Sequence, residues 1–192
     1  GGNVQGSGAS PNIQTDQLNY QSATGNFDAS LDRLTQPATT VSAATTGNVS
    51  FSSPHDLNVA ASGNNLNIST PGNLTATGTL LGTGAVTLQV GNTLSSSGRG
   101  PLVSAPSLNL QAGNTGRLTL DVDAISAVGT TLSFVFDRPN AQVQSIQGSD
   151  VTLSATGNLL VSGPVSATTL SLSSLGNMTL GASSVTATTA VL

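Results

Sequence analysis

The sequence predicts an all-β protein, a parallel β-helix (solenoid) with about 20 residues per coil and three short strands in each coil. Three observations lead to this prediction. Triplets of the form apolar, polar, apolar recur at a steady spacing, and nine Gly-Asn pairs separate them. The composition also favours strands and turns over helices.

The composition describes a globular chain with few charges. The 192 residues are 36% hydrophobic, which is enough for one domain with a sizeable core. Only 6% are charged, as eight Asp and four Arg, so Ser, Thr, Asn, Gln and Gly must keep the chain soluble. Four cations and a net charge of −4 argue against nucleic acid as a partner. The absence of cysteine excludes disulfides and thiolate metal sites. Apolar runs of about four residues are far too short to span a bilayer, so we expect no membrane insertion.

The repeat is clearest near the carboxyl end. Gly157-Asn158 recurs as Gly176-Asn177, an offset of 19, and the segment 165–169 recurs as 185–189, an offset of 20. Walking backwards, the main series of triplets begins at Leu170, Val151, Leu132, Leu108, Val86, Leu66 and Val49. A second series lies between them, with triplets that begin at Leu57, Leu74, Leu118, Leu159 and Met178.

The triplets predict which side chains are buried. Alternate residues of a strand face opposite sides, so the outer two of each triplet enter the core and the middle one meets water. We expect a buried set of Leu110, Leu120, Leu153, Leu172 and Leu180. We expect a solvent-facing set of Thr119, Thr152, Ser171 and Thr179.

Gly-Asn pairs are expected to mark the corners of the coils, since both residues tolerate left-handed backbone angles. One expected pair is missing between 113 and 157, where Asp137-Arg138-Pro139-Asn140 predicts a turn or a protruding loop. We therefore expect a β-helix over 46–192 with an insertion near 137–150. Residues 1–45 do not keep the repeat and are expected to form an irregular cap or degenerate coils, a disordered lead-in being the remaining alternative.

The segments GNLTATGTLLGTGAVTLQVGNTLSSSG and GNLLVSGPVSATTLSLSSLGNMTLGASSVTA resemble the filamentous-haemagglutinin-type repeats of two-partner-secretion exoproteins of Gram-negative bacteria. The resemblance covers about residues 47–192. It implies a right-handed parallel β-helix in a large adhesin, a haemolysin or the stalk of a contact-dependent inhibition toxin. It also implies secretion to the cell surface through an outer-membrane transporter partner. The secretion-domain motif of such proteins is not found here, so we expect an internal or truncated segment.

The expected function is that of a secreted cell-surface adhesin or stalk segment, with a structural and binding role and no catalysis. Its partner would be a receptor or glycan on a host or neighbouring cell. Irregular loops on rigid scaffolds carry recognition, so we expect binding at Asp137, Arg138, Pro139 and Asn140.

The alternative is a carbohydrate-active enzyme, a polysaccharide lyase or glycosidase. Asp121 and Asp123 stand two apart and could share a strand face, which suits an acid pair or a calcium ligand, but the expected reading is a solvated strand end between two coils. His55 beside Asp56 resembles a catalytic dyad, but adjacent strand residues face opposite sides, so a turn histidine is expected. We expect no metal and no cofactor.

Four asparagines lie in glycosylation sequons: Asn48, Asn67, Asn73 and Asn177. Some adhesins of the resembled family are modified at such sites. The repeat itself, in which Gly-Asn precedes an apolar residue and then Ser or Thr, also generates sequons without any modification.

Overall fold

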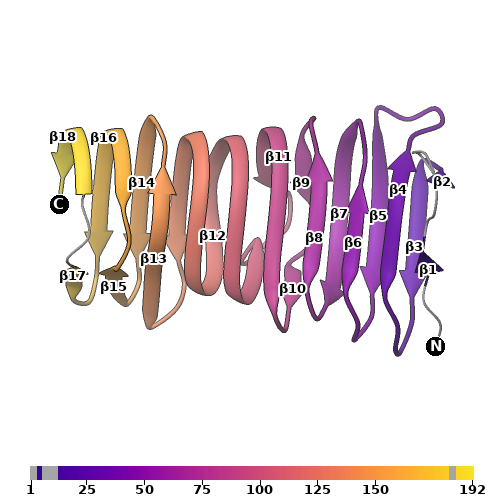
Figure 1. The fold of residues 1–192 in the computed structure, drawn as a ribbon, viewed down its shortest axis with the longest axis horizontal. Helices are drawn as coiled ribbons and strands as arrows, with labels where there is room; N and C mark the ends of the chain where they lie inside the picture. The colour runs from indigo at the N-terminus through magenta and orange to yellow at the C-terminus, as the bar shows by residue number, and fades with distance from the viewer. Residues whose placement is uncertain (1–3, 6–12, 182–184) are drawn as a thin grey trace.

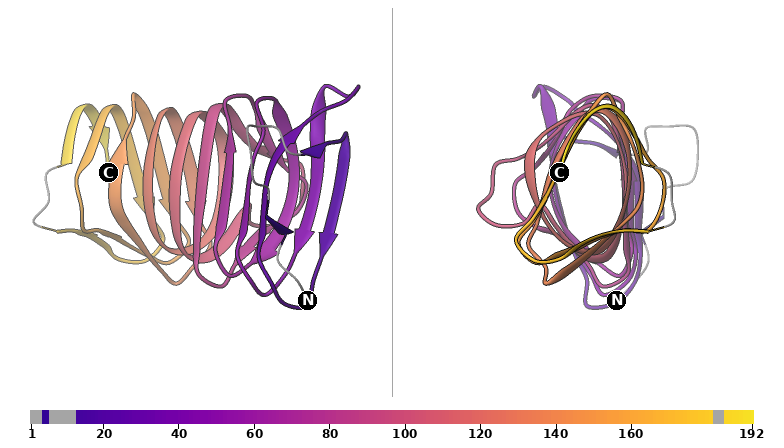
Figure 2. Two further views of the ribbon diagram at one scale, coloured as in Figure 1. Left: turned by 45° about the vertical axis from the view of Figure 1, so that its right-hand side comes forward. Right: turned by 90° about the vertical axis from the view of Figure 1, so that its left-hand side faces the viewer.

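A computed structural model describes residues 4–5, 13–181 and 185–192 of the chain. Over these residues it is a parallel β-solenoid without helices, of about nine turns with about 19 residues per turn. The turns follow one another along the long axis (Figure 1), and they enclose a common interior when seen end-on (Figure 2). The predicted parallel β-helix is confirmed. No helix in the described part of the chain is long and apolar enough to cross a membrane.

The strands of the solenoid vary in length from two to 34 residues. In chain order they are β1 (Val4–Gln5), β2 (Ile13–Gln14), β3 (Gln17–Gln21), β4 (Phe27–Asp32), β5 (Ala38–Ala44), β6 (Val49–Ser52), β7 (Asp56–Gly63), β8 (Leu66–Thr70), β9 (Leu74–Ala76), β10 (Leu80–Gly82), β11 (Ala85–Ser96), β12 (Val103–Phe136), β13 (Asn140–Gln147), β14 (Asp150–Ala155), β15 (Asn158–Val161), β16 (Val165–Ser174), β17 (Met178–Leu180) and β18 (Val185–Val191).

Neighbouring coils pair in parallel and in register. Val49 pairs with Leu66, and Leu66 pairs with Val86, so the first residues of the main triplets form one ladder. The coil from β8 to β10 has the three short strands that the sequence predicts. Most of the other strands are longer than triplets, because pairing with the adjacent coil extends past the apolar pairs. The longest, β12, continues through several corners.

The core follows the alternation within each strand. Four of the five predicted core leucines, Leu110, Leu120, Leu153 and Leu172, are at most 4% exposed. Of the residues between them, Thr152 and Thr179 are exposed, while Thr119 and Ser171 are half-buried. The prediction is wrong for Leu180, which is 44% exposed. Its strand β17 pairs only with β15, so no further coil covers its other side within the described residues.

Residues 13–45 take part in the same stack. Phe27 of β4 pairs with Val49, an offset of 22, and Val41 of β5 pairs with Val59, an offset of 18. Phe27 and Val41 are both buried. The coils here are regular in pairing but unequal in length, which hides the repeat in the sequence. Residues 13–45 thus fit the predicted degenerate coils and are neither a separate cap nor a disordered lead-in, whereas residues 1–3 and 6–12 of the predicted region lie outside the described part of the chain.

The expected insertion near 137–150 is wrong. Residues 140–147 form β13, which pairs in parallel with β12 on one side and with β15 on the other. Ala141, Val143 and Ile146 of this strand are buried in the core. Asn140 pairs with Asn158, so Pro139-Asn140 occupies the corner position where other coils have Gly-Asn. The chain makes a turn at 137–139 and no protruding loop there.

Close approach between coils explains the corner glycines better than backbone angles do. Among the described residues, Gly25 is the one corner glycine with a positive φ, at 113°. At Gly47 a Cβ atom would lie 2.1 Å from the Gly25 carbonyl oxygen, and at Gly157 it would lie 2.3 Å from that of Pro139. These corners need glycine because the neighbouring backbone occupies the space of a side chain.

Candidate functional site

Asp121 and Asp123, the candidate acid pair, share one partner. Both lie in β12, and both contact Arg138 in the turn that follows this strand. The Arg138 Nε donates to Asp121 Oδ1 at 2.5 Å, and Nη1 donates to Asp123 Oδ1 at 2.7 Å. The two carboxylates therefore do face the same side, as their spacing predicts. The structure joins them to Arg138, which the sequence placed in a separate binding site.

These ion pairs connect three successive coils. The Ser104 hydroxyl donates to Asp121 Oδ2 at 2.7 Å from the coil before, while Arg138 reaches Asp121 from the coil after. Both oxygens of Asp121 are thus engaged within the protein. The side chains of Arg138, Asp121 and Asp123 are 30%, 32% and 58% exposed, so each pair stabilises the fold by about 1 kcal/mol at most.

The other residues of the 137–140 turn also make contacts between coils. The Asp137 amide donates to the Leu120 carbonyl at 2.8 Å. The Pro139 carbonyl accepts the Asn158 amide at 2.7 Å, and Asn140 Oδ1 accepts Asn158 Nδ2 at 2.8 Å. Asn158 Oδ1 in turn accepts the Asn177 amide at 2.8 Å. This turn is therefore one end of an asparagine ladder along a corner of the solenoid.

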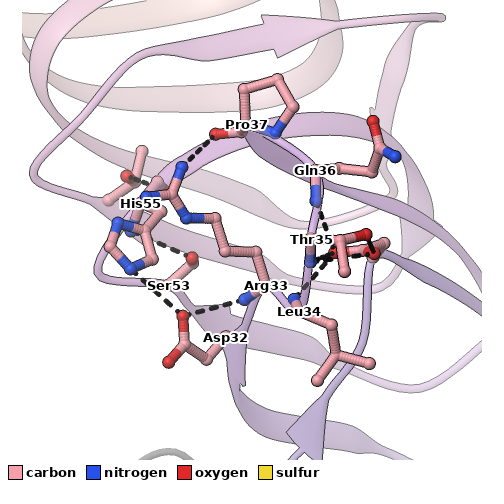
Figure 3. A network of polar contacts seen from close by, with 10 residues as sticks. Asp32, Arg33, Leu34, Thr35, Gln36, Pro37, Ser53 and His55 are labelled. Atoms are coloured by element: carbon pink, nitrogen blue, oxygen red, sulfur yellow. Dashed lines mark hydrogen bonds and ion pairs between the residues drawn. The ribbon is translucent and has the colours of Figure 1, made fainter.

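His55 pairs with an aspartate of the preceding coil and not with its neighbour in sequence. His55 Nε2 lies 3.2 Å from Asp32 Oδ1, at the end of β4 (Figure 3). Asp56 instead accepts the backbone amide of Asn73 at 2.7 Å and its Nδ2 at 3.1 Å. Both hydrogen bonds lower the pKa of Asp56, and the bond from the Asn73 backbone amide has the larger effect. The expectation that His55 and Asp56 do not act together is in line with this geometry.

A loop between β4 and β5, residues 33–37, closes around a carboxylate that sequence analysis did not single out. Asp16 Oδ1 accepts the backbone amides of Leu34, Thr35 and Gln36 at 2.7, 2.8 and 3.0 Å. The Thr35 hydroxyl donates to Asp16 Oδ2 at 2.5 Å. Arg33 fixes the other side of the loop through a 3.1 Å bond to the Pro37 carbonyl (Figure 3). The signal available in the sequence was the offset of 18 to 20 residues, one coil, between Asp16 and this loop.

A shallow hollow of about 510 Å³ lies beside Asp16, lined mainly by polar side chains such as Thr15, Gln36 and Thr40. Asp16 itself is fully engaged by the loop, so the hollow offers hydroxyl and amide groups. Within the described residues, no group of three His or Asp side chains could hold a metal ion.

The four sequon asparagines are all exposed. Asn73 Nδ2, the atom that would carry a glycan, donates to Asp56. Asn48 Oδ1 accepts a hydrogen bond from Asn65 Nδ2 at 3.0 Å, so this bond does not involve Asn48 Nδ2, the atom that would carry a glycan. Asn67 projects from the middle of β8, and Asn177 lies at a corner. Glycosylation at these four positions stays a prediction.

The fold and these contacts define a parallel β-solenoid with charge-poor walls, on which several of the few charged side chains, such as Asp16, Asp56, Asp121 and Arg138, connect adjacent coils. The chain matches no protein-family model, no curated protein and no solved structure.

The Asp16 contacts predict a specific dependence of stability on pH. The Thr35 hydroxyl, followed by the Gln36 and Thr35 amides, holds the pKa of Asp16 well below its ordinary value of 3.8. A lowered pKa in the folded state stabilises the fold above the unfolded value, and this stabilisation is lost as the pH falls below about 4 towards the folded pKa. We expect Asp16→Asn to lower the free energy of unfolding at pH 6, and the difference from the parent chain to shrink by pH 2.

Urea titrations of both chains at pH 6 and pH 2 measure this effect. The matched control is Asp28→Asn, because Asp28 is an exposed strand aspartate in the same coils. A difference between Asp16→Asn and the parent that is equal at both pH values would contradict the role of the ionised carboxylate.

Proposed function

We propose that this chain is a secreted cell-surface adhesin or stalk segment of a Gram-negative bacterium, with a structural and binding role and no catalysis. In this proposal it belongs to an exoprotein with filamentous-haemagglutinin-type repeats that leaves the cell through an outer-membrane transporter partner. Its ligand is a receptor or glycan on a host or neighbouring cell.

The observation that carries this proposal is the character of the outer wall. Along each strand the core alternates with Ser, Thr, Asn and Gln, so rows of hydroxyls and amides run along a stiff rod. Such groups make weak hydrogen bonds, which gain strength by repetition. The engagement of Asp121 by Ser104 and Arg138 supports the same reading over the glycosidase alternative, since an acid pair must be directed at the substrate.

The proposal predicts binding that depends on multivalent display. We expect the chain alone to bind target cells feebly, and latex beads densely coated with it to bind about 100-fold or more tightly. Flow cytometry of beads against bacterial and epithelial cells measures this. The matched control is beads coated with Leu153→Asp, which has nearly the same composition but a charge in the core of the stack.

Two outcomes would contradict the proposal. Parent and Leu153→Asp beads that bind cells equally would show that adhesion does not use the folded rod. Measurable cleavage of a polysaccharide by the parent chain, lost in Asp121→Asn, would replace the binding role with an enzymatic one. The same Asp121→Asn chain must unfold within about 1 kcal/mol of the parent for that comparison to hold.

A further inference from the structure

Besides the loop at 33–37, a second loop interrupts the stack at residues 97–101, between β11 and β12. Before it Leu74 pairs with Leu94, an offset of 20, but after it Leu80 pairs with Val103, an offset of 23. Three residues are therefore extra relative to the coil before. The following coil is also shorter here. Leu94 pairs with Thr115 and the Leu102 amide donates to the Thr119 carbonyl, so the segment from 94 to 102 lies opposite the shorter segment from 115 to 119. The loop stands out from the wall in the end-on view (Figure 2).

Arg99 lies at the centre of this loop. It is exposed, as are Gly98 and Gly100 on its two sides. Gly100 has a φ of 104°, a left-handed angle that lets the chain turn tightly here, and a Cβ at this position would meet nothing within 4 Å. Arg99 is thus an exposed residue with no side chain on either of its chain neighbours.

Arg117 lies on the same part of the next coil. Two contacts between these coils lie on either side of the arginines: Leu94 pairs with Thr115, and the Leu102 amide donates to the Thr119 carbonyl. Arg99 lies between 94 and 102 on one coil, and Arg117 lies between 115 and 119 on the next. Arg117 is exposed, and a Cβ at the adjacent Gly116 would also meet nothing within 4 Å. Adjacent coils lie about 4.8 Å apart, which is within the reach of two arginine side chains that converge on one group.

The charge of these two arginines is not compensated locally. The sequence has no aspartate between 57 and 120, so Arg99 and Arg117 are the only charged residues in that span. Within the described residues neither makes an ion pair, whereas Arg138 binds two carboxylates. A chain with a net charge of −4 therefore has a small positive region at the 97–101 loop.

We propose that Arg99 and Arg117 together bind an oxyanion carried by a glycan, either a sulfate ester or a carboxylate. Guanidinium groups donate paired hydrogen bonds that match the oxygens of such groups. The exposed Ser96, directly before the loop, adds a hydroxyl that can hydrogen-bond to the sugar. The glycan part of this assignment rests on the proposed adhesive function, and it moves the expected recognition site from 137–140 to 97–101 and Arg117.

The test uses the whole chain and three immobilised polymers: neutral dextran, carboxymethyl dextran and dextran sulfate. We expect binding to one or both charged polymers and none to the neutral one, with affinity falling as salt rises. Arg99→Gln and Arg117→Gln should each weaken binding about tenfold, the effect of one lost hydrogen-bonded charge contact. Arg99→Lys should lose less than Arg99→Gln, because it keeps the charge. The preferred polymer identifies the oxyanion.

Arg138→Gln is the matched control, since its guanidinium is already occupied by Asp121 and Asp123, and it should bind as the parent does. Urea titration of every variant verifies that the fold is retained. Equal binding by parent, Arg99→Gln and Arg117→Gln would overturn the proposal, as would an equal loss in Arg138→Gln.

The two proposals fail separately. Beads whose adhesion to cells is unchanged by Arg99→Gln together with Arg117→Gln overturn this site and leave the adhesive function standing. Binding of a charged dextran that needs both arginines, by a chain whose beads adhere to no cell, supports the oxyanion site and overturns the adhesive function.

Discussion

Replacing Leu153 by Ala is expected to lower the free energy of unfolding by about 2–5 kcal/mol, the usual range for a buried leucine. Leu153 is fully buried, and it lies in a ladder between Phe134 of the coil before and Leu172 of the coil after. The lost methyl groups leave a space that neither neighbour can fill, because both are held in register by backbone hydrogen bonds on the same strands. Urea titration followed by circular dichroism measures the change.

Thr152→Ala is the matched control, since it lies one position away on the same strand and its side chain is exposed. We expect it to change the free energy of unfolding by less than about 0.5 kcal/mol. In a solenoid each coil contacts only its neighbours, so hydrogen exchange should locate the Leu153→Ala effect in β12, β14 and β16. Equal effects of the two substitutions would show that the alternation is assigned to the wrong faces.

The core could be predicted from the sequence because it depends on local alternation. Leu153 and Thr152 are assigned to opposite faces by their order in a triplet, whatever the coil length. The exception, Leu180, depends on whether another coil covers it, and a triplet carries no information on its neighbours. In a solenoid, the side of the strand that a residue faces is thus set by the local sequence. Whether that residue is buried at an end of the stack depends on the presence of a further coil.

The polar contacts could not be predicted, because they depend on the length of each coil. Asp121 reaches Arg138 over 17 residues, and His55 reaches Asp32 over 23. The paired offsets range from 17, as between Val49 and Leu66, to 23, as between Leu80 and Val103. An average period of about 20 residues therefore cannot say which side chains meet across coils, even where it correctly says that coils stack.

The same variation explains the misplaced insertion. A missing Gly-Asn pair between 113 and 157 suggested extra residues, but Pro139-Asn140 serves as the corner there. Extra residues do occur at 97–101, but a Gly-Asn pair stands on each side of them, at 91 and at 113, so the order of the Gly-Asn pairs gives no sign of them. The number of Gly-Asn corners indicates how many coils there are. Whether a loop projects depends instead on the number of residues between two paired positions.

Close contact between coils gives the second large expected effect, at Gly163. This buried residue follows β15, and its amide and that of Ser162 both donate to the Val143 carbonyl, at 3.2 and 2.9 Å. A Cβ at position 163 would lie 1.5 Å from the Gln144 carbonyl oxygen and 2.5 Å from its carbon. Relief of this overlap requires the backbones of two coils to separate, which breaks hydrogen bonds that continue the stack.

Gly163→Ala is therefore expected to lower the free energy of unfolding by about 3 kcal/mol, the upper part of the usual range for overpacking. The matched control is Gly116→Ala, where a Cβ meets nothing within 4 Å and φ is not positive. That substitution should leave stability unchanged or raise it by up to about 1 kcal/mol, because alanine restricts the unfolded chain. The two variants add the same methyl group, so urea midpoints that shift alike would mean that the approach of the coils at Gln144 and Gly163 does not limit the fold.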